Sequence, residues 1–237
     1  MLPKVQSSER IHRLGLNLIR FTKGKGVLGV DAFLRHSTVS KFLTPGVCLD
    51  AGSGRRPKLP LYRPDVKIIT LDLERAFGCH VVGDIRFLPF VDKCFDTVVA
   101  IDVLEHLPKK FRVSVLTELI RVANKRVIIH MPLQDGSTFK AKDYDTLFSK
   151  LYRKLYRKPC ITTEEHLTYQ YSHPADLTKR GFKLIGDQNA YCWIILVTLQ
   201  ELLYPFGNIV SWILYLLFLK WIEKRPPYWG AFAFITF

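Results

Sequence analysis

The chain has 237 residues, of which 48% are hydrophobic, and this length and composition suit one globular domain with an elaboration. Its formal net charge of +14 favours an acidic partner, such as an anionic membrane surface or a nucleic-acid backbone. The five cysteines show no Cys-x-x-Cys spacing, which argues against a disulfide framework and a zinc site. We therefore expect a reducing, cytoplasmic location and no metal.

Two helices are predicted ahead of the first strand. Apolar residues recur with helical periodicity at 8–21 and 28–43, and the glycine-rich segment 23–26 separates them. We assign residues 1–45 to a helical lead-in that covers one edge of a sheet. Charged residues interrupt any apolar run in the first twenty residues, which argues against a secretory signal.

Strands and helices then alternate, which predicts a parallel, doubly wound α/β sheet. The β-rich runs lie near residues 46–50, 66–72, 79–83, 95–101 and 125–131, and a helix from 108 to about 122 precedes the last run. A proline stands in the first turn of that helix. Three more prolines, Pro57, Pro60 and Pro64, follow the first strand, so the first crossover is expected to be short or irregular.

The first strand ends in a glycine-containing loop. Asp50 is followed by Gly52 and Gly54, and residues without a Cβ let the backbone turn sharply and approach a ligand. Pro57 stands where the dinucleotide fingerprint has its third glycine, so a pyrophosphate site is disfavoured. The second strand ends in Asp72, at about the spacing from which an acid accepts the hydroxyls of a ribose.

Two further segments complete an ordered set of motifs. Residues 83–90 read GDIRFLPF and residues 94–107 read CFDTVVAIDVLEHL. Together with the Asp-x-Gly-x-Gly loop, they resemble class I S-adenosylmethionine-dependent methyltransferases, in the small-molecule and lipid subgroup with GD-x-x-x-LPF and VLEHL motifs. The resemblance covers residues 46–189 and implies a S-adenosylmethionine-binding core.

The resemblance also implies the fold and the cofactor residues. The family has a Rossmann-like, mostly parallel seven-stranded sheet with an antiparallel last strand, for which residues 182–188 and 229–237 are the candidates. The implied cofactor contacts are Asp50, Gly52, Ser53 and Gly54 at the methionine end, Asp72 and Leu73 at the ribose, Asp84 and Ile85 near the adenine, and Asp102.

The sequence lacks two features that are typical of methyltransferases acting on nucleobases, and this narrows the class of methyl acceptor. Methyl transfer from a sulfonium is an in-line displacement, so alignment matters more than a nucleophilic side chain. Residues 101–104 do not form a Pro-Pro-aromatic tetrapeptide and no cysteine stands near the tops of the fourth or fifth strands, which disfavours nucleobase acceptors. An acceptor hydroxyl would need a base, for which His166 ranks first, with His106 and His130 as further candidates.

A nearly uncharged insertion occupies residues 190–222. Glu201 is its one charged residue before Lys220, and the break at 205–208 leaves two halves that are short for a membrane span. We predict a helical hairpin that faces a membrane interface without crossing it. A hydrophobic lid and a dimer interface are the open alternatives. Residues 223–237 then return to the core as the final strand.

Residues 140–158 add a basic amphipathic helix, in which lysines and arginines interleave with leucines and aromatic residues. We therefore predict a class I methyltransferase that acts on a small or lipid-linked acceptor and is peripheral on the cytoplasmic membrane face. An RNA methyltransferase that uses the basic surface is the first alternative. The second is a membrane-associated adaptor that keeps the fold without turnover.

Overall fold

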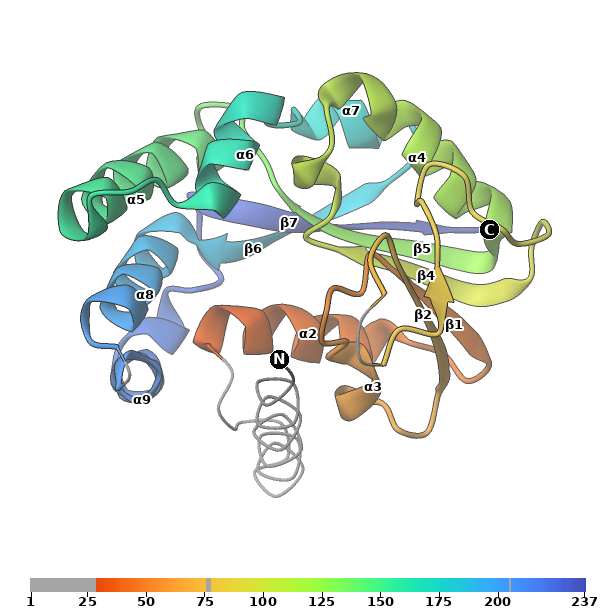
Figure 1. The fold of residues 1–237 in the computed structure, drawn as a ribbon, viewed down its shortest axis with the longest axis horizontal. Helices are drawn as coiled ribbons and strands as arrows, with labels where there is room; N and C mark the ends of the chain where they lie inside the picture. Colours follow the sequence, from red (N-terminus) through yellow and green to blue (C-terminus); the bar gives the residue numbers. More distant parts are fainter. Residues whose placement is uncertain (1–28, 76–77, 205) are drawn as a thin grey trace, which may run out of the picture.

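The computed structural model describes residues 29–75, 78–204 and 206–237, so the helix predicted at 8–21 lies outside the described residues. A seven-stranded sheet in the order β3-β2-β1-β4-β5-β7-β6 forms the centre of the molecule (Figure 1). Its strands are β1 (Val47–Ala51), β2 (Lys67–Asp72), β3 (Val81–Val82), β4 (Phe95–Ile101), β5 (Ala123–Pro132), β6 (Lys183–Asn189) and β7 (Tyr228–Thr236).

The sheet is parallel from β3 to β5, and β7 pairs antiparallel with both β5 and β6. The predicted fold class is therefore confirmed. Strands β4 and β5 contain the apolar runs 98–101 and 127–129, whose residues are buried because both faces of the sheet are covered there. Alternate residues serve the two faces: Val98 of β4 joins one hydrophobic cluster and Val99 joins the other.

Helices cover both faces, as Figure 1 shows. The first half of the chain has α2 (Val30–Phe42), α3 (Leu59–Tyr62), the 3-10 turn η1 (Leu104–His106) and α4 (Lys109–Val122). The second half has α5 (Ala141–Tyr156), α6 (Ile161–Tyr169), α7 (Pro174–Thr178), α8 (Ala190–Leu202), α9 (Gly207–Leu217) and the 3-10 turn η2 (Leu219–Trp221). Helices α4 and α7 pack on one face of the sheet, whereas α2 and α3 pack on the other.

Three sequence predictions are settled by these helices. The first crossover is the single turn α3, as the prolines predicted. The prediction that α2 covers a sheet edge is wrong, because Val39 belongs to a hydrophobic cluster that spans one face of the sheet and includes residues of β1, β2, β4, β5 and β7. Pro108 is the N-cap of α4 with an extended ψ of 135°, one position before the first turn in which it was expected.

The insertion between β6 and β7 is a helical hairpin of α8 and α9. The Asn189 side chain begins α8 by accepting hydrogen bonds from the N–H groups of Tyr191 and Cys192. Because β6 and β7 pair in one sheet, the chain returns to the side that it left. Among the described helices, none combines the length and the apolar character that a membrane crossing requires.

Candidate functional site

A cavity of about 360 Å³ lies at the carboxyl ends of β1, β2 and β4. This is where the strand order reverses, between β1 and β4, and open α/β sheets bind ligands at such a switch point. The lining residues are Gly52, Gly54, Leu71, Asp72, Leu73, Gly83, Asp84, Ile85, Arg86, Asp102, Val103, His106 and Leu107. Four segments that are far apart in the sequence therefore meet around one space of small-molecule size.

Backbone hydrogen bonds hold the glycine loop against β2. The N–H groups of Gly52 and Ser53 both donate to the Leu71 carbonyl, at 2.8 and 3.0 Å. The Gly54 N–H donates to Asp72 Oδ2 at 2.7 Å. Gly52 has φ +78° and a Cβ there would lie 2.5 Å from a methyl group of Val103, so both backbone strain and close approach require glycine.

The predicted acidic residues occupy different positions around this cavity. Asp72 lines it at the end of β2, whereas Asp50 is buried in β1 and Ser53 is likewise outside the lining. Burial, followed by the nearby Asp72, raises the pKa of Asp50 to about 7. The Asp84 carboxylate lines the cavity and accepts two-pronged hydrogen bonds from Arg86, the shortest at 2.6 Å, which lower its pKa.

Asp102 lines the cavity and belongs to a buried ionic network. Its Oδ1 lies 2.6 Å from His130 Nδ1, and its Oδ2 lies 2.7 Å from Arg35 Nε. The other ring nitrogen of His130 lies 3.1 Å from Asp187. Burial alone would lower the pKa of His130, but Asp102 and Asp187 outweigh it and raise the pKa to about 9. With both nitrogens engaged, His130 is poorly suited to act as a base.

The two histidines ranked as catalytic are brought together. His106 in η1 lines the cavity, and His166 in α6 is buried beside it, with 4.9 Å between the ring centroids. Sequence reasoning did not select Glu105, whose carboxylate lies against both rings, nor Asp145, which holds His166 from α5. The sequence did contain one signal for Glu105: the segment Leu-Glu-His-Leu at 104–107 resembles Glu-Glu-His-Leu at 164–167, and both place a glutamate directly before a histidine.

The residues around the cavity fit the cofactor that the motifs imply. Gly54 would point a Cβ into open space, so the loop leaves room for a ligand at this point. Asp72 supplies an acceptor for ribose hydroxyls, and the side chains of Leu73, Ile85 and Leu107 supply an apolar wall for a nucleobase. When bound, S-adenosylmethionine supplies an electrophilic methyl group on a sulfonium. The residues around the cavity would then orient that methyl group toward the acceptor and exclude water.

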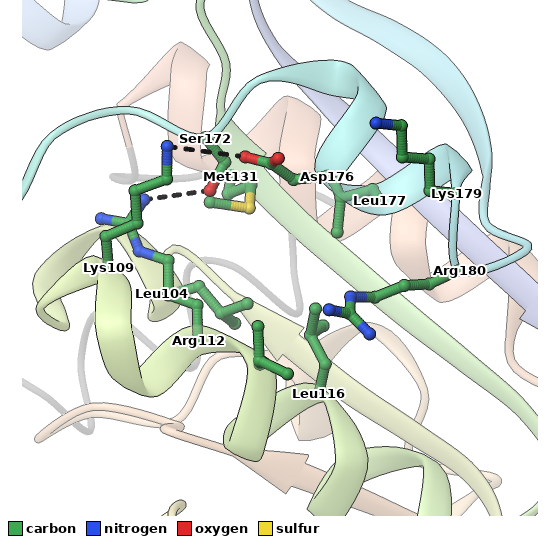
Figure 2. A pocket seen from close by; sticks show the side chains of 11 residues that line it. Leu104, Lys109, Arg112, Leu116, Met131, Ser172, Asp176, Leu177, Lys179 and Arg180 are labelled. Atoms are coloured by element: carbon green, nitrogen blue, oxygen red, sulfur yellow. Dashed lines mark hydrogen bonds and ion pairs between the residues drawn. The ribbon is translucent and has the colours of Figure 1, made fainter.

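A second cavity, of about 390 Å³, lies between α4 and α7 (Figure 2). Lys109 pairs with Asp176 at 3.8 Å across its rim, and Arg112 donates to Ser172 at 3.0 Å. Lys179 and Arg180 add further positive charge. Among the residues that the structure describes, none of the predicted catalytic or cofactor residues lines it, so this cavity is separate from the candidate site.

Comparisons with known proteins agree with this geometry. Residues 58–131 match the model of a family described as a methyltransferase domain. A SAM-dependent methyltransferase from Archaeoglobus fulgidus is similar in structure, with a TM-score of 0.53 and 16% identity over 88% of this chain and 93% of that one. A second one, from Thermotoga maritima and described as a possible histamine N-methyltransferase, has a TM-score of 0.51 and 15% identity over 98% and 95%.

Other comparisons extend less far. A protein from Pyrococcus horikoshii matches at 21% identity and a TM-score of 0.39, over 51% of this chain and 60% of its own length. The comparison with curated proteins gives no match. The structural likenesses establish the fold, whereas the family match over β2, β4 and most of β5 connects that fold with methyl transfer.

Proposed function

We propose that the chain is a class I S-adenosylmethionine-dependent methyltransferase that methylates a small, apolar or lipid-linked acceptor at a membrane surface. The match of residues 58–131 to a methyltransferase-domain family and the likeness of the fold to a SAM-dependent methyltransferase support the enzyme class and the cofactor. The observation that carries the proposal is the apolar surface of the α8–α9 hairpin. Its exposed large side chains include Ile209, Ile213, Leu216, Leu217, Phe218 and Trp221. An exposed apolar surface of this extent is typical of a protein or membrane interaction site.

The two helices of the hairpin differ in a way that supports this proposal. Trp193 and Leu196 of α8 are buried, while α9 buries only Gly207 and Ser211 along its length. Helix α9 packs Trp212, Leu214 and Tyr215 against a small hydrophobic cluster. Its opposite side chains, Ile209, Ile213, Leu216 and Leu217, are exposed. A helix in a bilayer interface buries such side chains among the lipid chains without crossing.

An apolar groove of about 380 Å³ between α5 and α8 suits the same class of acceptor. Its walls are mainly Phe148, Leu151, Leu155 and Leu202, with one acidic residue, Glu201, and one basic residue, Lys154. A hydrocarbon chain gains free energy in such a groove because its apolar surface leaves water. The groove opens beside the hairpin, so a lipid-like molecule could pass from a membrane into contact with the protein.

The exposed basic residues of α5 complement an anionic membrane. Lys150 and Lys154 are exposed on this helix, and Arg153 pairs with Glu164 at 2.8 Å. Basic side chains next to an apolar surface add electrostatic attraction to anionic lipid. The same residues favour RNA as the alternative acceptor, since phosphate backbones bind lysine and arginine. We place RNA second because the apolar hairpin would have no role in RNA binding.

Transfer of a labelled methyl group tests the proposal. The full chain would be incubated with methyl-labelled S-adenosylmethionine and, separately, with a total lipid extract, with RNA, or without acceptor. We expect label in the organic phase of the lipid reaction. Label in RNA alone would establish the alternative, and binding of S-adenosylhomocysteine without any transfer would favour the inactive adaptor.

Vesicle flotation tests the membrane surface itself. In the Leu217→Ser, Phe218→Ser double variant, loss of about 1.5 kcal/mol of burial per side chain predicts roughly 100-fold weaker association with anionic vesicles. The matched control is Val91→Ser, Phe237→Ser, which changes equally exposed apolar residues elsewhere. Wild-type association should survive high salt, because apolar burial is not screened. Equal association of both double variants would contradict the proposal.

A further inference from the structure

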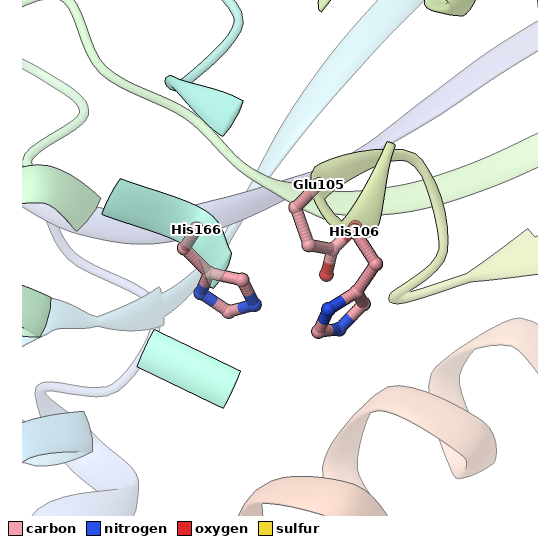
Figure 3. Close-up of side chains that lie close together, drawn as sticks. All are labelled: Glu105, His106 and His166. Atoms are coloured by element: carbon pink, nitrogen blue, oxygen red, sulfur yellow. The ribbon is translucent and has the colours of Figure 1, made fainter. Parts of the chain in front are cut away.

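Three side chains converge next to the cofactor cavity. Glu105 and His106 come from η1 and His166 comes from α6, and Figure 3 shows their carboxylate and imidazole groups turned toward one another. One potential ligand atom from each residue lies within 4.8 Å of the other two. Because His106 also lines the cofactor cavity, this cluster borders the space in which the methyl group would be presented.

Two members of the cluster have unused polar atoms in the interior. Glu105 is 2% exposed, and within the described part of the chain neither of its carboxylate oxygens has a hydrogen-bond partner. His166 is 6% exposed, and its Nε2 likewise has no partner among the described residues. Buried polar atoms are almost always satisfied, because leaving one unpaired costs about 1–3 kcal/mol. These atoms therefore call for a partner that the residues described by the structure do not supply.

The other ring nitrogen of each histidine is held by a carboxylate. His106 Nδ1 lies 2.7 Å from Glu165, and His166 Nδ1 lies 2.8 Å from Asp145. Asp145 is itself fixed by the Tyr171 hydroxyl at 2.6 Å and by the Trp229 indole N–H at 2.7 Å. A proton held on Nδ1 leaves the Nε2 lone pair free to coordinate, and carboxylate–histidine–metal arrangements are built in this way.

We propose that Glu105, His106 and His166 bind a divalent transition-metal cation at the edge of the cofactor cavity. Two imidazoles and one carboxylate form a ligand set that suits zinc, cobalt or iron rather than magnesium. Metal bonds of about 2.0–2.2 Å place neighbouring ligand atoms about 3–3.5 Å apart, so distances between the three ligand atoms, now up to 4.8 Å, would shorten by up to about 1.5 Å on binding. Asp145 and Glu165 would fix the orientation of the two rings.

The position of the cation beside the cofactor cavity indicates which class of acceptor the enzyme would methylate. This inference rests on the proposed methyltransferase function. Three protein ligands leave coordination positions open, as in catalytic metal sites. An acceptor hydroxyl bound there would lose its proton to water more readily because of the cation's charge. Its oxygen would then form the bond to the methyl carbon while the carbon–sulfur bond breaks and sulfur keeps the electron pair. The site therefore favours an oxygen acceptor.

Metal binding can be measured without any methyl acceptor. We would strip the untagged full chain with a chelator and titrate it with Co²⁺ alone, following visible absorption and bound metal after equilibrium dialysis. We expect one Co²⁺ per chain and a melting temperature that rises with Co²⁺ concentration, because a ligand of the folded state stabilises it. Mg²⁺ should not compete. Absence of stoichiometric Co²⁺ binding by the folded wild type would overturn the proposal.

Variants locate the site. Glu105→Gln and His166→Gln should each weaken Co²⁺ binding at least tenfold and abolish the rise in melting temperature. Glu164→Gln is the matched control, because Glu164 lies on α6 but bonds Ser149 and Arg153 instead. Unchanged Co²⁺ binding in Glu105→Gln and His166→Gln would also overturn the proposal. If either variant fails to fold, the dependence of wild-type stability on Co²⁺ decides.

Calorimetry with S-adenosylhomocysteine separates this proposal from the proposed function. Binding of S-adenosylhomocysteine without Co²⁺ binding would remove the metal site and leave the methyltransferase standing. If the chain binds Co²⁺ but does not bind S-adenosylhomocysteine, the metal site stands and the methyltransferase function is contradicted.

Discussion

The two glycines of the first loop are required for different reasons. A Cβ on Gly52 would collide with Val103, whereas a Cβ on Gly54 would meet nothing within 4 Å. Both residues have positive φ, which costs any other residue about 1–2 kcal/mol. A larger residue at position 52 would therefore disturb the packing as well as the ligand site, because Val103 must move to make room.

We expect Gly52→Val to lose S-adenosylhomocysteine binding and to lower the free energy of unfolding by several kcal/mol, through the combined effect of overpacking and strain. Gly54→Ala should lower that free energy by only about 1–2 kcal/mol. Urea unfolding measures stability, and calorimetry measures binding. If Gly52→Val bound the ligand as tightly as the wild type, the loop would not be the cofactor site.

Asp72 is expected to act on both the cofactor and the loop. Replacing it with alanine removes the acceptor for the Gly54 N–H as well as the predicted ribose contact. We expect Asp72→Ala to weaken S-adenosylhomocysteine binding by about 1.5–3 kcal/mol, the range for a hydrogen bond to a charged group. Glu74→Gln is the control, since Glu74 is exposed and pairs with Arg55. Equal affinities of the two variants in calorimetry would remove Asp72 from the site.

At the scale of elements, the hairpin is not one uniform unit. Trp193 of α8 stacks on Trp229 of β7, with 4.9 Å between ring centroids, and meets Phe148 of α5 edge-on. Helix α8 therefore belongs to the core, whereas the exposed apolar side chains of the hairpin lie mainly in residues 202–222, at the end of α8 and beyond it. Replacing residues 190–222 with a short linker would therefore remove part of the core.

Single substitutions within α8 check this division. We expect Trp193→Ala to lower the free energy of unfolding by about 3–5 kcal/mol, because it leaves a large cavity next to Trp229. Ile195→Ala, on the same helix but with its side chain partly in solvent, should cost less than 1.5 kcal/mol. Urea unfolding distinguishes the two. Similar small losses in both variants would show that α8 is peripheral.

At the scale of the whole molecule, a charged network joins α2, the end of β4, β5 and β6. Arg35, Asp102, His130 and Asp187 are its members. Burial alone would raise the pKa of Asp102, but Arg35 and His130 outweigh it and hold that pKa below its usual value. Because this network joins segments 152 positions apart, from Arg35 to Asp187, its protonation bears on global stability.

The raised pKa of His130 predicts a specific pH dependence. Folded His130 holds its proton more tightly than the unfolded chain, so its contribution is full below pH 6.5 and is lost as pH rises through about 9. We expect the difference in unfolding free energy between the wild type and His130→Gln to shrink over that interval. Urea titrations at several pH values measure it. A constant difference would mean that His130 is neutral when folded.

The sequence by itself determined the sheet and the rim of the cofactor cavity. Strands β1, β2 and β4 appear as short apolar runs, and each carries its acidic or glycine residues at the carboxyl end. In a parallel sheet those ends meet at one edge, so local order along the chain is enough to assemble Gly54, Asp72 and Asp102 around one cavity.

Tertiary structure alone decided which groups meet across that edge. His106 and His166 are 60 positions apart, and whether their rings face each other depends on how α6 packs against η1. Packing between distant segments also decides that the Glu105 carboxylate is left unpaired among the described residues and that Arg35 forms an ion pair with Asp102. It likewise decides that α8 buries more of its large side chains than α9 does. Periodicity tells which residues are apolar or charged, but the partner of each is set by packing between distant segments, and local pattern does not encode it.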